Sequence, residues 1–128
     1  MKIMRTRILI ADDHTMIRDG LKALINRQAD MEVVGRAENG QQAIELAREL
    51  QPDVILMDVR MPVMDGIEAA CRILSEMPGM KILALSMYTD NGFIKGMMHA
   101  GARGYIAKDS DPEELYKAIR NAAKPGDS

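Results

Sequence analysis

The sequence is poor in cysteine, in aromatic residues and in long apolar runs. Its single cysteine, Cys71, excludes an internal disulfide and is typical of a reducing compartment. Aromatic residues form 3% of the chain and tryptophan is missing, so no ring platform for stacking nucleic-acid bases is expected. No apolar run approaches the roughly 20 residues that span a bilayer, and the basic start at residues 1–7 lacks the apolar stretch of a secretory signal. We therefore expect a cytoplasmic protein.

Two further absences narrow the function. The net charge is −2 and the isoelectric point lies near 5.7, so no general attraction to nucleic acids or anionic membranes is expected. Neither glycine-rich phosphate pattern, GxxxxGK[ST] or GxGxxG, occurs, which argues against a bound nucleotide. With 128 residues, 47% of them hydrophobic and 28% charged, the chain has the size and composition of one globular domain.

Short apolar runs alternate with helical patterns along the chain. Each run has the length of a strand, and each following segment repeats apolar residues at the spacing of one helical face. Continuous apolar strands separated by helices predict an α/β fold, a doubly wound parallel sheet of five strands covered on both faces. The expected strands are residues 7–11, 31–37, 54–57, 81–86 and 104–107, and the expected helices are about 15–28, 39–50, 65–77, 90–101 and 111–122.

The residues that follow the strands are polar or charged. They are Asp12 and Asp13 after the first strand, Asp58 after the third, Ser86 at the end of the fourth and Lys108 after the fifth. Because sites in open parallel sheets form beyond the carboxyl ends of the strands, we expect these side chains to converge. Each has an ordinary explanation by itself; Asp12 or Asp13, for example, could cap the next helix. Clustered carboxylates repel one another, however, and a divalent cation with oxygen ligands, Mg²⁺, would neutralise them.

A carboxylate at such an edge can act as a nucleophile and become an aspartyl phosphate. Phosphoryl transfer depends on positioning and on stabilisation of charge more than on further covalent chemistry. Asp58, at the end of a buried run, is the expected nucleophile, with the ion on Asp13 and Asp58 bridging to the phosphoryl oxygens. Lys108 and Ser86 are expected to hold the other oxygens.

Four segments carry a resemblance to a known family. IADDH (10–14), LMDVRMPVMDG (56–66), ALS (84–86) and GARGYIAKD (101–109) occur in the order and at the strand ends that are typical of the receiver domain of a two-component response regulator. The chain resembles these CheY-like domains over residues 7–123. The resemblance implies a flavodoxin-like sheet with strand order 2-1-3-4-5. The first and last segments are most similar to the NarL/FixJ, or LuxR-type, subfamily.

The resemblance implies a role for each of the converging residues. Asp58 would be the phosphoacceptor, and Lys108 matches the lysine of the family. Ser86 and Tyr105 match its switch pair. The implied ligands of Mg²⁺, or of Mn²⁺ in its place, are Asp13, Asp58, the backbone carbonyl of Arg60 and, largely through water, Asp12.

Partners and domain limits also follow from the resemblance. A sensor histidine kinase is the expected phosphoryl donor, and members of the subfamily carry a DNA-binding helix-turn-helix domain after the receiver. We expect residues 1–123 to form the receiver and 124–128 to begin a linker or a disordered tail, with DNA bound only through a domain outside these residues. A free-standing receiver is the open alternative. Asp109 stands where many receivers have a proline after a cis bond, so the geometry of the bond from Lys108 stays open.

The helix expected at 90–101 has more apolar residues than one buried stripe requires. They are Phe93, Ile94, Met97 and Met98, of which the last three are the candidate interface residues. Either these side chains pack on the sheet, or they form a partner or dimer surface that phosphorylation remodels. Cys71 is expected in the core, and His14 and His99 are expected to have no catalytic role.

Three rival functions can be weighed against the receiver. A phosphatase with an aspartyl nucleophile would carry a second aspartate two residues after Asp58, where this chain has Arg60. A flavodoxin-like cofactor binder would carry a phosphate loop rich in hydroxyl residues and glycine after the first strand, which is missing. An atypical receiver would act as an interaction module without phosphorylation, and the full acidic set argues against it. We expect a phosphoacceptor rather than a multiple-turnover enzyme.

Overall fold

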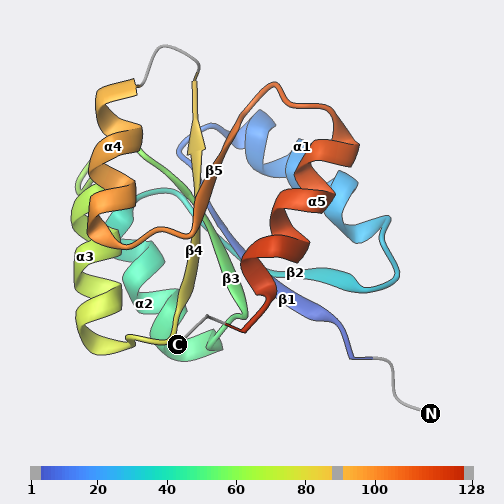
Figure 1. Cartoon of the computed structure of the whole chain (residues 1–128), viewed down its shortest axis with the longest axis horizontal. Coiled ribbons are helices and arrows are strands. Elements are labelled where there is room, and N and C mark those ends of the chain that lie inside the picture. The colour runs from blue at the N-terminus through green and yellow to red at the C-terminus, as the bar shows by residue number, and fades with distance from the viewer. Residues whose placement is uncertain (1–3, 88–90, 126–128) are drawn as a thin grey trace.

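The computed structural model of the protein describes residues 4–87 and 91–125. Within these residues, five parallel strands form one sheet in the order β2-β1-β3-β4-β5 (Figure 1). The strands are β1 (Thr6–Ala11), β2 (Met31–Ala37), β3 (Val54–Asp58), β4 (Lys81–Ser86) and β5 (Gly104–Ala107). The predicted doubly wound fold and its strand order are therefore confirmed.

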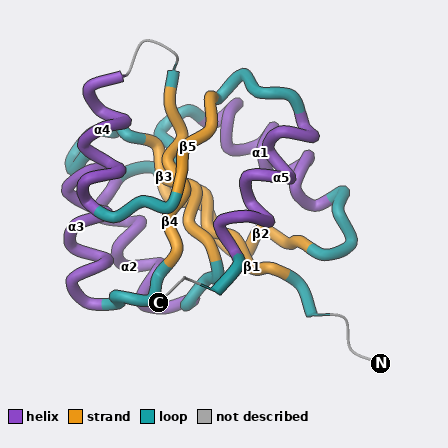
Figure 2. Tube along the Cα trace, viewed as in Figure 1, coloured by secondary structure: helices purple, strands orange, loops and turns teal. Residues whose placement is uncertain are grey.

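Helices cover both faces of this sheet. In the described part of the chain they are α1 (Thr15–Asn26), α2 (Gly40–Leu50), α3 (Gly66–Glu76), α4 (Asn91–Ala100) and α5 (Pro112–Ala123). Figures 1 and 2 show α1 and α5 on one face and α2, α3 and α4 on the other. Both faces are thereby removed from water, which explains why the strand sequences are apolar throughout.

Alternate residues of each strand enter different halves of the core. Ile8 and Ile10 of β1 pack with apolar residues of α1 and α5, whereas Leu9 between them packs with those of α2 and α3. All three side chains are fully buried. This is the arrangement expected when successive side chains of a strand point to opposite faces and both faces are covered. The central strands are held from two sides, so their carboxyl ends are rigid supports for a site.

The helix ends follow the capping residues of the sequence. The side chains of Asn39 and Asp111 accept hydrogen bonds from backbone N–H groups at the starts of α2 and α5, as N-caps do. The first helix ends at Asn26, earlier than expected, and the third begins one residue late because Asp65 is its cap. Residue 90, the expected start of the fourth helix, lies outside the described residues.

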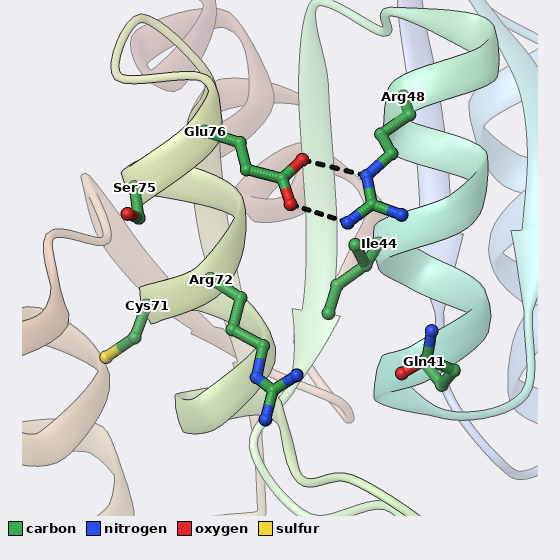
Figure 3. Close-up of a pocket in the computed structure, with 7 residues that line it drawn as sticks. All are labelled: Gln41, Ile44, Arg48, Cys71, Arg72, Ser75 and Glu76. Atoms are coloured by element: carbon green, nitrogen blue, oxygen red, sulfur yellow. Dashed lines mark hydrogen bonds and ion pairs between the residues drawn. The ribbon is translucent and has the colours of Figure 1, made fainter.

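The prediction that Cys71 lies in the core is wrong. The buried residues of α3 are Gly66, Ala69, Ala70 and Ile73. Cys71 is exposed, because one residue of an α-helix turns the side chain by about 100° and carries it off the buried stripe. Figure 3 shows the thiol turned away from α2, whereas the ion pair of Arg48 and Glu76 joins α2 to α3 on the other side of the helix.

Of the two alternatives for Met97, packing in the core is confirmed and the interface role is wrong. Met97 is fully buried and packs with α3 in the core cluster beneath α4. The neighbouring Met98 is 41% exposed and Phe93 is 39% exposed, while Ile94 is half-buried. Helix α4 therefore uses part of its apolar surface for packing and leaves another part open to solvent.

The loop after β3 contains a residue with an unusual backbone conformation. Val63, in the loop after β3, has a φ of 69°, a conformation that is unusual for a β-branched residue, and its side chain is exposed.

The described residues contain no cis peptide bond, so the bond from Lys108 to Asp109 is trans. Of the tail expected at 124–128, residues 126–128 lie outside the described part. Among the described helices, none combines the length and the apolar character needed to cross a membrane.

Candidate functional site

Strand β3 carries Asp58 to the carboxyl edge of the sheet. Every residue of this strand is buried, and Asp58 itself is 2% exposed. Its Oδ1 accepts a hydrogen bond of 3.2 Å from the backbone N–H of Arg60, and Leu85 of β4 is its partner in the sheet register. The sheet thus holds the main chain of Asp58, and the turn that follows holds its side chain.

The turn after β1 brings two more carboxylates to the same edge. Asp12 is fully buried, and its N–H donates to the carbonyl of Ala37 at 3.0 Å. Its Oδ1 accepts a hydrogen bond of 2.9 Å from the backbone N–H of His14, which is itself the N-cap residue of α1 and makes no side-chain cap. Asp13 is exposed beside it. The capping explanation for Asp12 and Asp13 is therefore wrong.

Lys108 reaches the carboxylates from the end of β5, a strand at the edge of the sheet. It directly follows β5, and its Nζ lies 2.9 Å from Oδ2 of Asp12 and 2.9 Å from Oδ2 of Asp58. Only the contact with Asp58 has the geometry of a hydrogen bond. The side chain of Lys108 is 7% exposed, so this ion-paired group is largely removed from water.

Burial and the neighbouring charges act in opposite directions on the pKa values of Asp58 and Lys108. Burial raises the pKa of Asp58 to about 6; the hydrogen bond from Lys108 opposes the rise and the charge of Asp12 adds to it. Burial lowers the pKa of Lys108, but the carboxylates of Asp12 and Asp58 together outweigh it, and the pKa of the ammonium group is raised. At neutral pH the site therefore holds a charged lysine beside a carboxylate whose ionised form is disfavoured.

We expect Asp58→Asn to stabilise the protein at pH 7.5 when a chelator removes divalent ions. The pKa of Asp58 is about 6 in the folded chain and about 3.9 in an unfolded chain, so folding favours the protonated form. The ionised carboxylate opposes folding above pH 6, and this cost disappears below the unfolded pKa. Solvent screening at the open side of the site reduces this cost. The free energy of unfolding of Asp58→Asn is therefore expected to exceed that of wild type by about 1–2 kcal/mol at pH 7.5, and the difference shrinks as the pH falls towards 4.

Urea unfolding at pH 7.5 and pH 4.5 measures this difference. Asp109→Asn is the matched control, because Asp109 is exposed outside the site, and its effect is expected within about 0.5 kcal/mol at both pH values. An equal effect of Asp58→Asn at the two pH values would contradict the electrostatic explanation.

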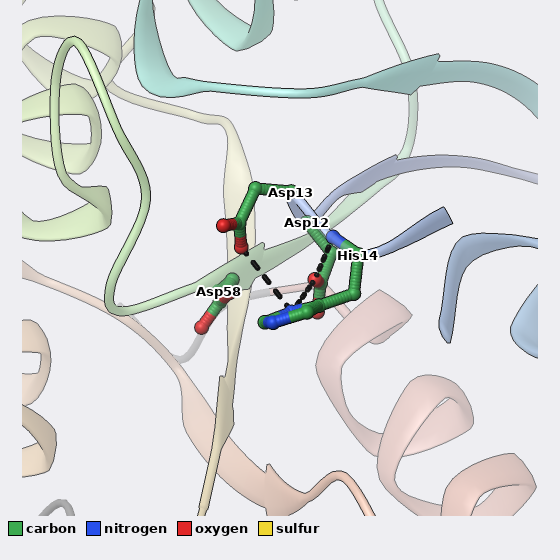
Figure 4. Close-up of side chains that lie close together, drawn as sticks. All are labelled: Asp12, Asp13, His14 and Asp58. Carbon is green, nitrogen blue, oxygen red and sulfur yellow. Dashed lines mark hydrogen bonds and ion pairs between the residues drawn. The ribbon is translucent and has the colours of Figure 1, made fainter. Parts of the chain in front are cut away.

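The donor set fits a small divalent cation. Ligand atoms of Asp12, Asp13, His14 and Asp58 all lie within 4.8 Å of one another (Figure 4). Oδ2 of Asp12 is buried and accepts no hydrogen bond. Carboxylate oxygens with room for water are the donors that Mg²⁺ prefers, and Mn²⁺ takes the same oxygen ligands. An open depression of about 460 Å³, lined by Asp13, Asp58 and Lys108 among others, gives access to the site.

Sequence reasoning missed the position of His14. Its Nδ1 lies 3.0 Å from Oδ1 of Asp12 and 3.3 Å from Oδ1 of Asp13, and the ring is largely exposed. The sequence did contain a signal for this position, because His14 directly follows the two aspartates and so lies in the same turn. The imidazole is therefore part of the surroundings of the site.

The remaining predicted site residues lie around this centre. Ser86 is 2% exposed at the end of β4 and pairs in register with Ala107. Tyr105, on β5, is 58% exposed and so points out of the core. Arg60 lines the depression, and its guanidinium lies 5.3 Å from the centre of the Phe93 ring. The roles of Ser86, Tyr105 and the Arg60 carbonyl stay predictions.

The five-stranded parallel sheet and the aspartates at its carboxyl edge are typical of one protein family, and comparison with known proteins identifies the same family. Residues 8–120 match the response regulator receiver domain family, and the chain belongs to this family. The predicted resemblance is thus confirmed.

Known relatives point to the predicted subfamily. The chain is 46% identical to the transcriptional regulatory protein YxjL of Bacillus subtilis, over 94% of this chain and 55% of that protein. It is 45% identical to the transcriptional regulatory protein LiaR of the same organism, over 92% and 56%. A crystal structure of a LuxR-family two-component response regulator from Aurantimonas matches with a TM-score of 0.87 and 37% identity, covering 93% of this chain and 85% of that one. The chain spans about half the length of these curated relatives.

Proposed function

We propose that this receiver accepts a phosphoryl group from a sensor histidine kinase on Asp58. The observation that carries the proposal is the buried carboxylate of Asp58, held 2.9 Å from the ammonium of Lys108 and grouped with Asp12 and Asp13. A carboxylate so placed is rigid, and the ammonium of Lys108 lies where the negative charge of the phosphoryl group must be stabilised.

The proposed ligands of Mg²⁺, or of Mn²⁺, are Asp12, Asp13, Asp58 and the backbone carbonyl of Arg60. The Oδ2 of Asp12 supports this assignment, because this buried acceptor has an ion pair with Lys108 but accepts no hydrogen bond, and such an oxygen favours a bound cation. When bound, such an ion neutralises the negative charge that the phosphoryl group brings to the carboxylates.

The chain's own residues then perform the transfer. A carboxylate oxygen of Asp58 forms a bond to phosphorus while the phosphorus–nitrogen bond to the donor histidine breaks. The imidazole keeps the bonding electrons and takes up a proton. Lys108, paired with Asp58 before transfer, donates to a phosphoryl oxygen afterwards, and the hydroxyl of Ser86 donates to another. The protein supplies positions and charges and undergoes one covalent change.

Phosphorylation is proposed to act on the face formed by α4, β5 and α5. The Ser86 hydroxyl moves towards the phosphoryl group, and the ring of Tyr105, exposed in this structure, turns into the space that it leaves. Ile94 and Met98 remain candidate contacts on α4, since they are not fully buried. The resulting change in a partner or homodimer surface would control an output domain.

The wider setting is proposed from the relatives. Residues 1–123 would form the receiver and 124–128 the start of a linker or tail, and any contact with DNA would be made by a helix-turn-helix domain outside this chain. The names of the relatives support a role in transcription. The single cysteine supports a location in the reducing cytoplasm.

The deciding experiment treats the protein with acetyl phosphate and follows its mass. A gain of one phosphoryl group is expected with Mg²⁺, none with a chelator, and none in Asp58→Asn. Asp53→Asn is the matched control, because Asp53 lies at the opposite end of β3, where its Oδ2 accepts a hydrogen bond from the backbone of Arg7. No mass gain in the wild-type protein would favour the phosphorylation-independent interaction module, and turnover of an added phosphomonoester would favour an enzyme.

A further inference from the structure

One buried charge has no part in the proposed transfer. The buried polar or charged residues of the described chain are Asp12, Arg18, Asp58 and Ser86, and all but Arg18 belong to the candidate site. Arg18 lies on α1 and is 8% exposed. A guanidinium is costly to bury unless its donors are used, so its hydrogen-bond partners indicate what it stabilises.

The guanidinium of Arg18 is bonded to the turn that carries the acidic residues. Its Nη1 donates to the backbone carbonyl of Asp12 at 2.5 Å, and its Nη2 donates to Oγ1 of Thr15 at 3.2 Å. Nη2 also lies 3.7 Å from Oε1 of Glu38, beyond the end of β2. One side chain therefore joins the end of β1, the first turn of α1 and the loop after β2.

The bonded carbonyl belongs to the peptide that links Asp12 to Asp13. Because a peptide unit is planar, fixing this carbonyl restricts the rotation on both of its sides, at ψ of Asp12 and at φ of Asp13. The other contacts of Asp12 involve its N–H, which donates to Ala37, and its carboxylate. The bond from Arg18 is thus the contact that sets the plane in which the chain passes from one carboxylate to the next.

We propose that Arg18 is a positioning residue for the cation: it fixes the peptide between Asp12 and Asp13 so that both carboxylates face the site before an ion binds. This inference rests on the proposed function, because it requires the acidic site to take Mg²⁺. Arg18 acts through the backbone and touches neither the ion nor the phosphoryl group. Groups that orient metal ligands in this way typically change metal affinity by about 10–100-fold when they are removed.

The test compares Arg18→Met with the wild-type protein. Methionine has a similar length and no donors, so the Asp12 carbonyl loses its partner. Isothermal titration calorimetry measures the dissociation constant for Mg²⁺, and phosphorylation by acetyl phosphate gives the half-saturating Mg²⁺ concentration and the maximal rate. We expect Arg18→Met to weaken Mg²⁺ binding and raise the half-saturating concentration about 10-fold, with the maximal rate within about two-fold of wild type.

Arg36→Met is the matched control. Arg36 joins β2 to α1 as well, through an ion pair of 2.7 Å with Asp19 on the surface, and its guanidinium is thus bonded to a residue outside the Asp12 turn. Its loss is expected to change Mg²⁺ affinity by less than about two-fold. An equal effect of Arg36→Met and Arg18→Met would overturn the proposal, as would an unchanged Mg²⁺ affinity in Arg18→Met with only a lower unfolding midpoint.

Arg18→Lys keeps the charge and loses the planar fork. Its Mg²⁺ affinity is expected to lie between those of wild type and Arg18→Met. Should Arg18→Met fail to unfold cooperatively, Arg18→Lys decides: binding weaker by about three-fold or more supports the positioning role, and wild-type affinity overturns it. Failure of the wild-type protein itself to bind Mg²⁺ would overturn the proposed function, whereas equal binding by wild type and Arg18→Met would overturn this inference alone.

Discussion

Lys108→Met is expected to slow phosphorylation of Asp58 by about 10²–10³-fold, the effect of removing a preorganised charge-stabilising group from a site of this kind. The Nζ of Lys108 lies 2.9 Å from both Asp12 and Asp58. Without it, two buried carboxylates face each other. The pKa of Asp58, already about 6, is then expected to rise further, because the cation that lowers it is gone. Without a bound ion a protonated carboxyl group is a poor nucleophile, and with the ion bound the phosphoryl product would still lose a hydrogen-bond donor.

The rate is measured from the mass gain with acetyl phosphate at saturating Mg²⁺. Mg²⁺ binding should persist in Lys108→Met, since removing an ammonium from beside two carboxylates leaves their attraction for another cation intact; this separates the lysine from the metal ligands. Lys81→Met is the matched control, because Lys81 begins β4 and its Nζ donates to the carbonyl of Ala123, away from the carboxyl edge. Phosphorylation of Lys108→Met within about five-fold of the wild-type rate would contradict the role of the lysine.

Sequence alone predicted the convergence of these groups because it depends on two simple regularities. Apolar runs of strand length separated by helical patterns imply a parallel sheet, and parallel strands present their carboxyl ends at one edge. Asp12, Asp58 and Lys108 needed no further information to be placed together. Their contacts of 2.9 Å could not be predicted, since a distance depends on how each turn is closed.

The misplaced residues show where periodicity stops being informative. On α3 and α4, apolar residues outnumber the positions that a single stripe can bury. Cys71 was therefore assigned to the wrong side and the side of Met97 was left open, because which apolar residue faces inward is decided by the neighbouring helix. The left-handed φ of Val63 had no sequence signal at all, since that conformation is typical of glycine or asparagine.

Arg18 represents another kind of limit. Its spacing on α1 places it between apolar positions, but a pattern of polar and apolar residues does not tell a solvated arginine from a buried one. The deciding feature is a backbone carbonyl, that of Asp12, which every residue has and no sequence pattern marks. Groups that support a site through the backbone therefore become visible only when the turn itself is seen.

Gly66→Ala is expected to destabilise the protein by about 3 kcal/mol or more, at the upper end of the effects of overpacking. A Cβ at Gly66 would lie 2.0 Å from the backbone oxygen of Asp58 and 2.9 Å from its carbonyl carbon. Neither atom belongs to a flexible side chain, so relief requires the end of β3 to separate from the start of α3. The carboxylate of Asp58 would move with it, and phosphorylation should fall together with stability.

Urea unfolding and the acetyl phosphate assay measure the two effects of Gly66→Ala. Gly20→Ala is the matched control: nothing lies within 4 Å of a Cβ built at this position in α1, so the substitution is expected to stabilise the protein by about 0.5–1 kcal/mol through helix propensity. The same chemical change should thus act in opposite directions at the two glycines. If the free energy of unfolding of Gly66→Ala lay within about 1 kcal/mol of the wild-type value, the contact between α3 and Asp58 could open at little cost. That result would contradict the rigid support that the proposed transfer requires.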